Sequence, residues 1–378
     1  RHSIDALLGT SWMREYYRYM TNSTINDLGG TDITGFQNED GKISAGDSNA
    51  ALLSFFARVN YDYDNKYLLS LSIRRDESSK FHKDNRVGYF PSVSAGWNVH
   101  QEKWFQNPVM SKLKIRASYG ELGANFLNPY NFDAIAYGPI PYTVGGERYV
   151  TGRAAYLKSK DLKWETAKTT DIGIELGFFN NDLTLSLDYF VKKNVDLLAQ
   201  IDLNLSSGQI FEINSSREKP YVNTASVKNT GWEFMMNYRK QLTKDFHIDA
   251  TFNIATLKNK VLSLGENVQP ITSGAMSSYF NDAPSITMPG EAIGSFYGYK
   301  IDGFDAEGNF IFADMDKNGV VNANDKVILG SPIPDFTYGL NINMEYKDFD
   351  LTLFFQGVQG NDIFLSLIHI SEPTRRTP

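Results

Sequence analysis

The sequence predicts an all-β fold, specifically part of a transmembrane antiparallel β-barrel. Apolar and polar residues alternate with a period of two along many segments of about ten residues. Short turns and long connections alternate between these segments. Aromatic residues form 13% of the chain, as girdles at two membrane interfaces require. No apolar run reaches the ~18 residues of a spanning helix, so the prediction rests on strands.

The alternation is clearest at residues 183–189, where three leucines and a tyrosine alternate with polar residues such as Thr184 and Ser186. Residues 246–254 and 336–346 repeat it. A soluble sandwich would bury the apolar face in a core, whereas an outer-membrane barrel turns it toward lipid. About ten residues at ~3.3 Å rise and ~45° tilt cover roughly 23 Å, close to the ~25 Å apolar band of such barrels.

The order of connections supports the barrel independently. We predict strands at 4–15, 52–63, 67–76, 87–99, 113–122, 163–179, 182–198, 225–240, 245–257, 335–347 and 349–360. Short turns follow at 64–66, 180–181, 243–245 and 347–348, with one medium connection at 100–112 and long connections at 16–51, 123–162, 199–224 and 258–334. Outer-membrane barrels place short turns in the periplasm and long loops outside. The short turn at 347–348 lies on the periplasmic side only if no strand crosses the membrane between 258 and 334. The strand-like segment 293–304 is therefore expected inside the last external loop.

Composition and motifs exclude several function classes. The net charge of −7 without a basic stripe argues against a nucleic-acid partner. Cysteine is absent, which excludes disulfides and thiolate sites within the chain. No metalloprotease, nucleophile-elbow, dinucleotide-binding or P-loop motif is present, so we expect no enzyme. Glu175 and Asp188 are a conceivable glycosidase pair, but acids on the polar face of alternating strands are the expected lining of a lumen.

Six segments resemble, in order, the SusC/RagA-type TonB-linked outer-membrane proteins of Gram-negative bacteria. They are RVNYDYDNKYLLSLSIRRDESSKF (58–81), GYFPSVSAGWNV (88–99), LKIRASYGELG (113–123), LKWETAKTTDIGIELGFFNNDLTLSLDYF (162–190), PGEAIGSFYGYKIDGF (289–304) and PDFTYGLN (334–341). The resemblance extends from about residue 7 to residue 364. Many ordered matches make it far more specific than a single short motif.

The resemblance implies a 22-stranded barrel, of which residues 1–364 would supply about eleven strands with long extracellular loops. It also implies an N-terminal plug, absent from this chain, and a location in the cell outer membrane. Expected partners are a SusD-type surface lipoprotein, TonB and outer-membrane lipid, and the expected function is import of glycans, oligosaccharides or peptides. Half a barrel has two open strand edges, so the chain is expected to be a fragment. The alternative is a soluble β-rich carbohydrate-binding protein or adhesin.

The last fourteen residues, 365–378, differ in character from the rest. LSLIHISEPTR at 365–375 resembles the translation of a transposase adapter used in preparing sequencing libraries. The alternative is a natural apolar segment, 365–370, followed by a turn at Pro373. We expect a non-native tail and assign no function to it.

One loop has the ligand spacing of a calcium site. In DMDKNGVVNAND (314–325) the predicted ligands occupy positions 1, 3, 5, 7, 9 and 12 of an EF-hand-like loop, with a glycine at the sharp turn, and are Asp314, Asp316, Asn318, Val320 through its carbonyl, Asn322 and Asp325. Aspartate replaces the usual glutamate at position 12, which weakens bidentate coordination. We predict a structural Ca²⁺; the alternative is an Asx-rich turn that bonds its own backbone.

Substrate contacts are expected from aromatic residues of the external loops, because rings stack on sugars or peptide side chains at modest entropy cost. The candidates are Tyr137, Tyr142, Tyr149 and Phe211. Packing of the loops against one another is an equally good explanation of these rings.

Overall fold

A computed structural model of the chain describes residues 1–23, 42–129, 136–154, 159–200, 221–265, 268–274 and 283–364. Its secondary structure is almost entirely β-strand. Within these ranges no helix is long and apolar enough to cross a membrane. The predicted tail at 365–378 and Phe211 lie outside the described residues.

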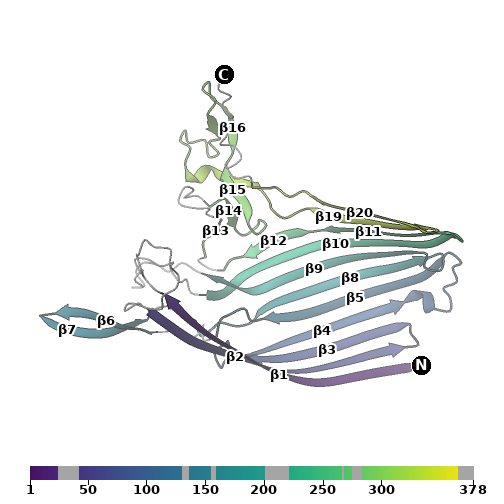
Figure 1. Ribbon diagram of the computed structural model, residues 1–378, viewed down its shortest axis with the longest axis horizontal. Helices are drawn as coiled ribbons and strands as arrows, with labels where there is room; N and C mark the ends of the chain where they lie inside the picture. Colours follow the sequence, from purple (N-terminus) through teal and green to yellow (C-terminus); the bar gives the residue numbers. More distant parts are fainter. Residues whose placement is uncertain are drawn as a thin grey trace.

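One antiparallel sheet dominates the molecule, with its strands side by side in Figure 1. Its strands are, in spatial order, β1 (His2–Ser23), β2 (Lys42–Tyr63), β3 (Tyr67–Ser78), β4 (Val87–Asn98), β5 (Met110–Ala124), β8 (Glu165–Phe178), β9 (Leu183–Gln200), β10 (Tyr221–Thr243), β11 (Phe246–Thr256), β19 (Phe336–Tyr346) and β20 (Phe349–Gln359). A further strand, β12 (Lys258–Ser263), pairs with β10. The eleven predicted strands are therefore confirmed, and β1 and β20 form the two edges of the sheet.

Short turns gather at one end of the sheet, on the right in Figure 1, which we call the turn end. Asp64 and Asn65 between β2 and β3 both have φ of 54°, and the amide of Asn65 donates to the Asp62 carboxylate at 2.7 Å. Asn180 and Lys347 also have positive φ. Asparagine and aspartate tolerate this conformation better than most residues, which favours chain reversal at positions 64, 65 and 180.

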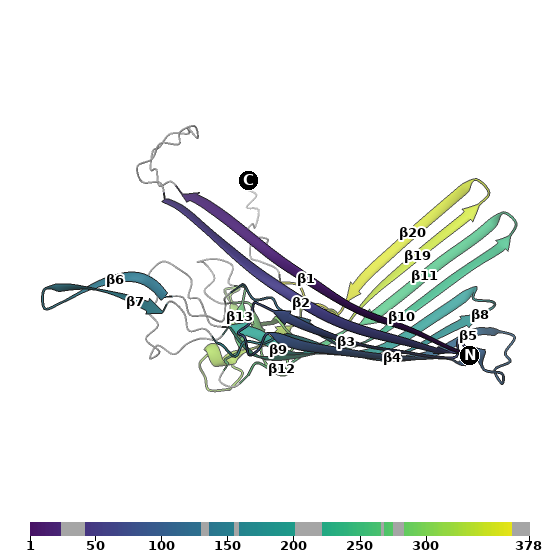
Figure 2. The same ribbon diagram turned by 90° about the horizontal axis from the view of Figure 1, so that it is seen from below.

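The opposite end, the loop end, holds more structure than predicted. β1 and β2 continue as a two-stranded ribbon into the segment expected to be loop, 16–51 (Figure 2). On the β1 side, Tyr16, Tyr17 and Tyr19 favour the extended conformation. β6 (Ala136–Val144) and β7 (Glu147–Ala154) form a separate hairpin within the second expected loop. Those two loop predictions were wrong in extent, although their position at this end was right.

The last long connection folds into small sheets beside the main one. These comprise β13 (Ile271–Ser273), β14 (Ser285–Thr287), β15 (Ser295–Tyr299) and β18 (Lys326–Gly330), and a pair formed by β16 (Ile301–Phe304) and β17 (Phe310–Phe312). The segment 293–304 thus contributes no strand to the main sheet, as the alternation of short turns and long connections predicts. Two 3₁₀ turns, η1 (Val99–Gln101) and η3 (Ala323–Asp325), complete the structure within the described ranges.

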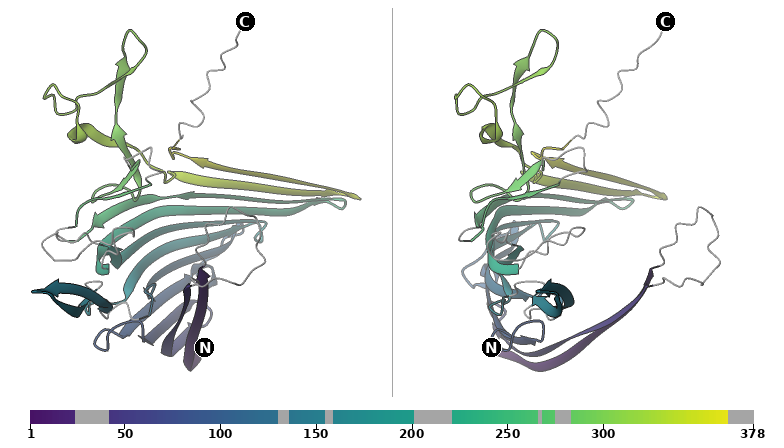
Figure 3. Two further views of the ribbon diagram at one scale, coloured as in Figure 1. Left: turned by 60° about the vertical axis from the view of Figure 1, so that its left-hand side comes forward. Right: turned by 90° about the vertical axis from the view of Figure 1, so that its left-hand side faces the viewer.

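The main sheet is curved like part of a barrel wall (Figure 3). Residues with apolar side chains on one face remain open to the surroundings, including Leu71 at 46% exposure, Ile172 at 56% and Trp232 at 51%. Their cross-strand partners share that face, because paired residues point to the same side of a sheet. A continuous exposed apolar face of this kind suits lipid rather than water.

Compact apolar clusters lie toward the loop end. One consists of Phe81, Phe90, Leu127, Leu162 and Trp164 and joins β4 to the segments before β8 and after β5. The Trp164 ring lies 5.2 Å from that of Phe81 and 5.4 Å from that of Phe90, and its indole N–H donates to the Arg86 carbonyl at 3.0 Å. This cluster fixes both ends of the connection between β5 and β8, together with the connection between β3 and β4, against the wall.

Candidate functional site: the polar wall and the acidic loop

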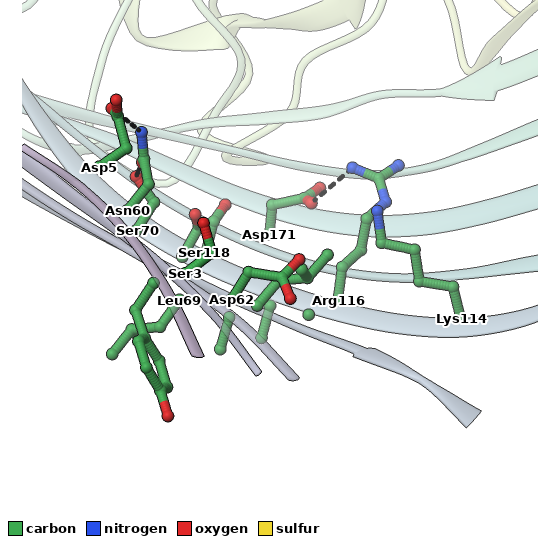
Figure 4. Close-up of a pocket in the computed structure, with 16 residues that line it drawn as sticks. Ser3, Asp5, Asn60, Asp62, Leu69, Ser70, Lys114, Arg116, Ser118 and Asp171 are labelled. Carbon is green, nitrogen blue, oxygen red and sulfur yellow. Dashed lines mark hydrogen bonds and ion pairs between the residues drawn. The ribbon is translucent and has the colours of Figure 1, made fainter. Parts of the chain in front are cut away.

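The concave face of the sheet carries polar side chains from neighbouring strands. They surround an open hollow of about 550 Å³ that extends from β1 to β8 (Figure 4). Cross-strand pairing places Asp5, Asn60, Ser70, Ser118 and Asp171 in one row. The Asn60 amide donates to Asp5 at 3.3 Å and accepts from Ser70 at 2.7 Å. A wetted wall of hydroxyls, amides and carboxylates fits the lumen of a barrel.

An ion-pair network extends this wall. Arg116 on β5 lies 2.6 Å from Asp188 on β9, 3.4 Å from Glu175 on β8 and 3.7 Å from Asp171 on β8. Lys112 pairs with Glu175 at 2.7 Å. The two acids considered as a glycosidase pair are therefore both bound to one arginine within the wall. Their arrangement matches charged lining better than a pair of catalytic carboxylates.

The opposite face has an aromatic row at the turn end. The rings of Tyr63, Tyr67 and Trp97 are stacked with centroids 6.2 and 6.3 Å apart. Glu102, in the connection after β4, accepts from Tyr67 at 2.7 Å and from the Trp97 indole at 3.2 Å, and pairs with Lys66 at 3.0 Å. The bond from the Tyr67 hydroxyl, followed by the bond from Lys66, lowers the pKa of Glu102. Amphipathic rings in such a row mark a membrane interface.

The acidic loop 314–325 brings three carboxylates together. One oxygen each from Asp314, Asp316 and Asp325 lies within 4.8 Å of the others. Two ligands of one Ca²⁺ are at most about 5.2 Å apart, because Ca–O distances are about 2.3–2.6 Å. Gly319 has φ of +87°, which provides the sharp turn the spacing requires.

Backbone amides also contact these carboxylates. Gly319 N–H donates to Asp314 at 2.6 Å, while the buried Asp325 accepts from Asn322 N–H and Met315 N–H, each at 2.7 Å. The bond from the Asn322 amide is the main reason that the pKa of Asp325 lies below its usual range. Each carboxylate oxygen has two lone pairs, so these bonds leave acceptor capacity for a cation. The Asn318 amide donates to Asp316 at 3.1 Å, and Val320 N–H donates to Asn318 at 2.8 Å.

The predicted substrate aromatics are only partly brought together. Tyr142 and Tyr149 are paired in the register of the β6–β7 hairpin, and Tyr137 is paired with Arg153. This hairpin projects from the loop end of the molecule (Figure 2). Substrate contact by these residues stays a prediction.

The fold agrees with comparisons to known proteins. The family model described as TonB-dependent receptor-like, β-barrel, matches residues 2–362. The chain belongs to this family. Its sequence is 36% identical over 330 residues to the TonB-dependent receptor P3 of Formosa agariphila, covering 82% of this chain and 32% of that receptor. It is 32% identical over 340 residues to the TonB-dependent receptor SusC of Bacteroides thetaiotaomicron, covering 84% of this chain and 32% of SusC.

A solved structure shares the same architecture. The RagAB peptide importer in its closed-closed state aligns with 95% of this chain and 39% of its own, at a TM-score of 0.75 and 22% identity. The predicted SusC/RagA resemblance and the barrel fold are thus confirmed, and the chain is part of an outer-membrane β-barrel. The chain spans about a third of the length of the receptors it matches.

Sequence reasoning missed the β6–β7 hairpin, although a signal was present. Gly145 and Gly146 have φ of 61° and 86° and form a two-residue turn, which a Gly-Gly pair between strand-like segments predicts. The Arg116 network was missed for another reason. Its members are far apart in sequence and meet only through the register of β5, β8 and β9.

Proposed function

We propose that this chain forms wall and external loops of a TonB-dependent outer-membrane importer of glycans, oligosaccharides or peptides that works with a SusD-type lipoprotein. The match of the barrel family over residues 2–362 is the observation that carries the proposal. The similarity to SusC and the shared fold with a peptide importer support it. The polar concave wall is suited to hydrated cargo, and no enzymatic role is proposed.

Uptake by the source bacterium tests this function. The complete receptor gene is deleted, and uptake of labelled oligosaccharides and labelled peptides is measured in the parent, the deletion strain and a strain lacking TonB. We expect both mutant strains to lose uptake of the same cargo. Restoring the receptor gene to the deletion strain should restore that uptake. Unchanged uptake of every cargo in the deletion strain would contradict the proposal. Genes adjacent to the receptor guide the choice of cargo, since enzymes encoded beside such importers commonly process it.

The soluble alternative predicts a different location. Fractionation of cells should place the complete receptor with the outer membrane, because the chain has a wide exposed apolar face. Recovery of folded receptor in the aqueous fraction would favour a soluble binding protein or adhesin.

We also propose that loop 314–325 binds Ca²⁺ as a structural ion. Support comes from the ligand spacing, the clustering of three carboxylates and the position of Gly319 at the turn. The ligands would be Asp314, Asp316, Asn318, Asn322 and Asp325 through side chains and Val320 through its carbonyl. The ion would cross-link a loop that lies between β17 and β18.

Calorimetric titration of the complete receptor with CaCl₂ tests the ion. Asp314→Ala should weaken binding at least tenfold, because it removes a charged ligand at position 1. Asp305→Ala is the matched control: Asp305 likewise bonds the backbone of its own turn, accepting from Asn309 N–H at 2.7 Å, but lies outside the predicted ligand set. Equal affinity of the parent and Asp314→Ala would leave the Asx-rich turn as the explanation.

A further inference from the structure

Four lysines face one another across adjacent strands of the main sheet. Lys168 on β8 pairs in register with Lys193 on β9, Lys193 with Lys228 on β10, and Lys228 with Lys260 on β12. We call Lys168, Lys193, Lys228 and Lys260 the lysine row. Directly opposed residues of a sheet share a face and lie in close contact, so four positive charges are lined up on one surface.

The lysine row lies on the apolar, convex face. Lys193 follows Tyr189 and Val191 at a spacing of two, and Lys228 lies four residues from Trp232, so all share that face. The rings of Tyr189 and Trp232 lie 4.8 Å apart just below the row.

The distance of the lysine row from the turn end matches the thickness of the hydrocarbon band. Lys193 is ten residues along β9 from Leu183 at the turn end. At ~3.3 Å per residue and ~45° tilt this is roughly 23 Å, against an apolar band of ~25 Å. The row therefore lies at the outer interface, where the headgroups of the external leaflet begin.

The charges of the lysine row are largely uncompensated. Glu121 on β5 pairs with Lys168 at 3.2 Å. Among the residues that the structure describes, no carboxylate forms an ion pair with Lys193, Lys228 or Lys260. Lys258 adds another positive charge on the same face of β12. Opposed like charges weaken strand pairing, so an anionic partner bound across the row would stabilise this part of the sheet.

We propose that the lysine row binds the phosphate groups of a lipid in the outer leaflet. A phosphorylated headgroup carries several negative charges that can bridge adjacent lysines. The acyl chains of the same molecule would cover the exposed rings and aliphatic side chains below the row, including Ile172 and Trp232. A soluble anion would neutralise the lysines only, whereas a lipid at this height contacts both the lysines and the adjacent apolar surface. The proposal is independent of which cargo the receptor imports.

Lipid binding to the purified complete receptor tests the proposal. Bis-phosphorylated lipid A and its dephosphorylated analogue are titrated in detergent, and bound lipid is counted by native mass spectrometry. The test variant carries Lys193→Gln, Lys228→Gln and Lys260→Gln. Each lysine near an anionic membrane surface contributes a factor of about five, so affinity for the phosphorylated lipid should fall about 100-fold.

A matched variant controls for the loss of three charges. It carries Lys103→Gln, Lys192→Gln and Lys244→Gln, which remove exposed lysines at the turn end and on the concave face. This variant should bind the phosphorylated lipid as the parent does. Replacement of Lys193, Lys228 and Lys260 by arginine should also retain binding, because guanidinium binds phosphate well.

Equal affinity of the parent and the glutamine variant of the row would overturn the proposal. So would equal affinity of the parent for the phosphorylated and dephosphorylated lipids. Competition by inorganic pyrophosphate as strong as that by the lipid would assign the row to a soluble anion instead. If the triple variant fails to fold, Lys260→Gln alone should lower affinity about fivefold and decides the question.

Discussion

Substitution of two adjacent residues on β3 distinguishes the environments of the two faces of the wall. Leu71 lies on the convex face at 46% exposure, whereas Ser72 lies on the concave face, where its hydroxyl is 2.7 Å from that of Ser92. Leu71 is four residues from Tyr67 at the turn end, which places it roughly 9 Å into a ~25 Å apolar band. Arginine near the midplane of such a band costs about 2–4 kcal/mol.

We therefore expect Leu71→Arg to lower the free energy of unfolding by about 2–4 kcal/mol. Ser72→Arg should lower it by about 1 kcal/mol or less, because it loses one hydrogen bond and places its charge in a wet lumen. The assay is guanidinium unfolding of the complete receptor folded into lipid vesicles, followed by tryptophan fluorescence. A similar loss for both variants, or a larger loss for Ser72→Arg, would refute the assignment of the faces.

Two further predictions concern the ends of the wall. Trp164→Ala should lower the local free energy of unfolding around this cluster by about 3–5 kcal/mol, because it removes the central buried ring. Proteases should then cut the β3–β4 and β5–β8 connections faster than in the parent. Trp164→Phe keeps a ring in place and should resist proteases nearly as well as the parent. The pKa of Glu102 is lowered in the folded protein, so the ionised carboxylate stabilises the connection 99–105 at pH values above the pKa of Glu102 in the unfolded chain. This stabilisation is lost as Glu102 becomes protonated, so protection from hydrogen exchange at 99–105 should decline as pH falls below about 4. Glu102→Gln should abolish that pH dependence, and a persistent decline in this variant would assign it to another group.

The strands could be predicted from sequence because each carries its own period-two pattern. In 183–189 the pattern alone identifies both faces of β9, and turn residues such as Asn180 mark where the chain reverses. The length of the strands and the alternation of short turns with long connections also predicted the membrane environment. These are local properties, and local order is what a single sequence encodes most directly.

Features that depend on register could not be predicted. Lys168 and Lys260 are far apart in the chain, and nothing local indicates that two other lysines lie between them on the sheet. The contacts of Arg116 with three acids arise in the same way. The calcium loop is the opposite case, since all its predicted ligands lie within twelve consecutive residues and spacing alone brings three of them together.

Thiol labelling along β3 tests the membrane-wall assignment most directly. The chain contains no cysteine, so a single cysteine placed at any of positions 69–73 is the one labelling site within this chain. Any cysteine in the rest of the complete receptor is replaced by serine. In intact outer membranes we predict that a water-soluble maleimide labels positions 70 and 72, while positions 69, 71 and 73 resist it and react with a lipid-soluble reagent. Uniform labelling by the water-soluble reagent, or the reverse alternation, would contradict a wall with one face in lipid and the other lining an aqueous lumen.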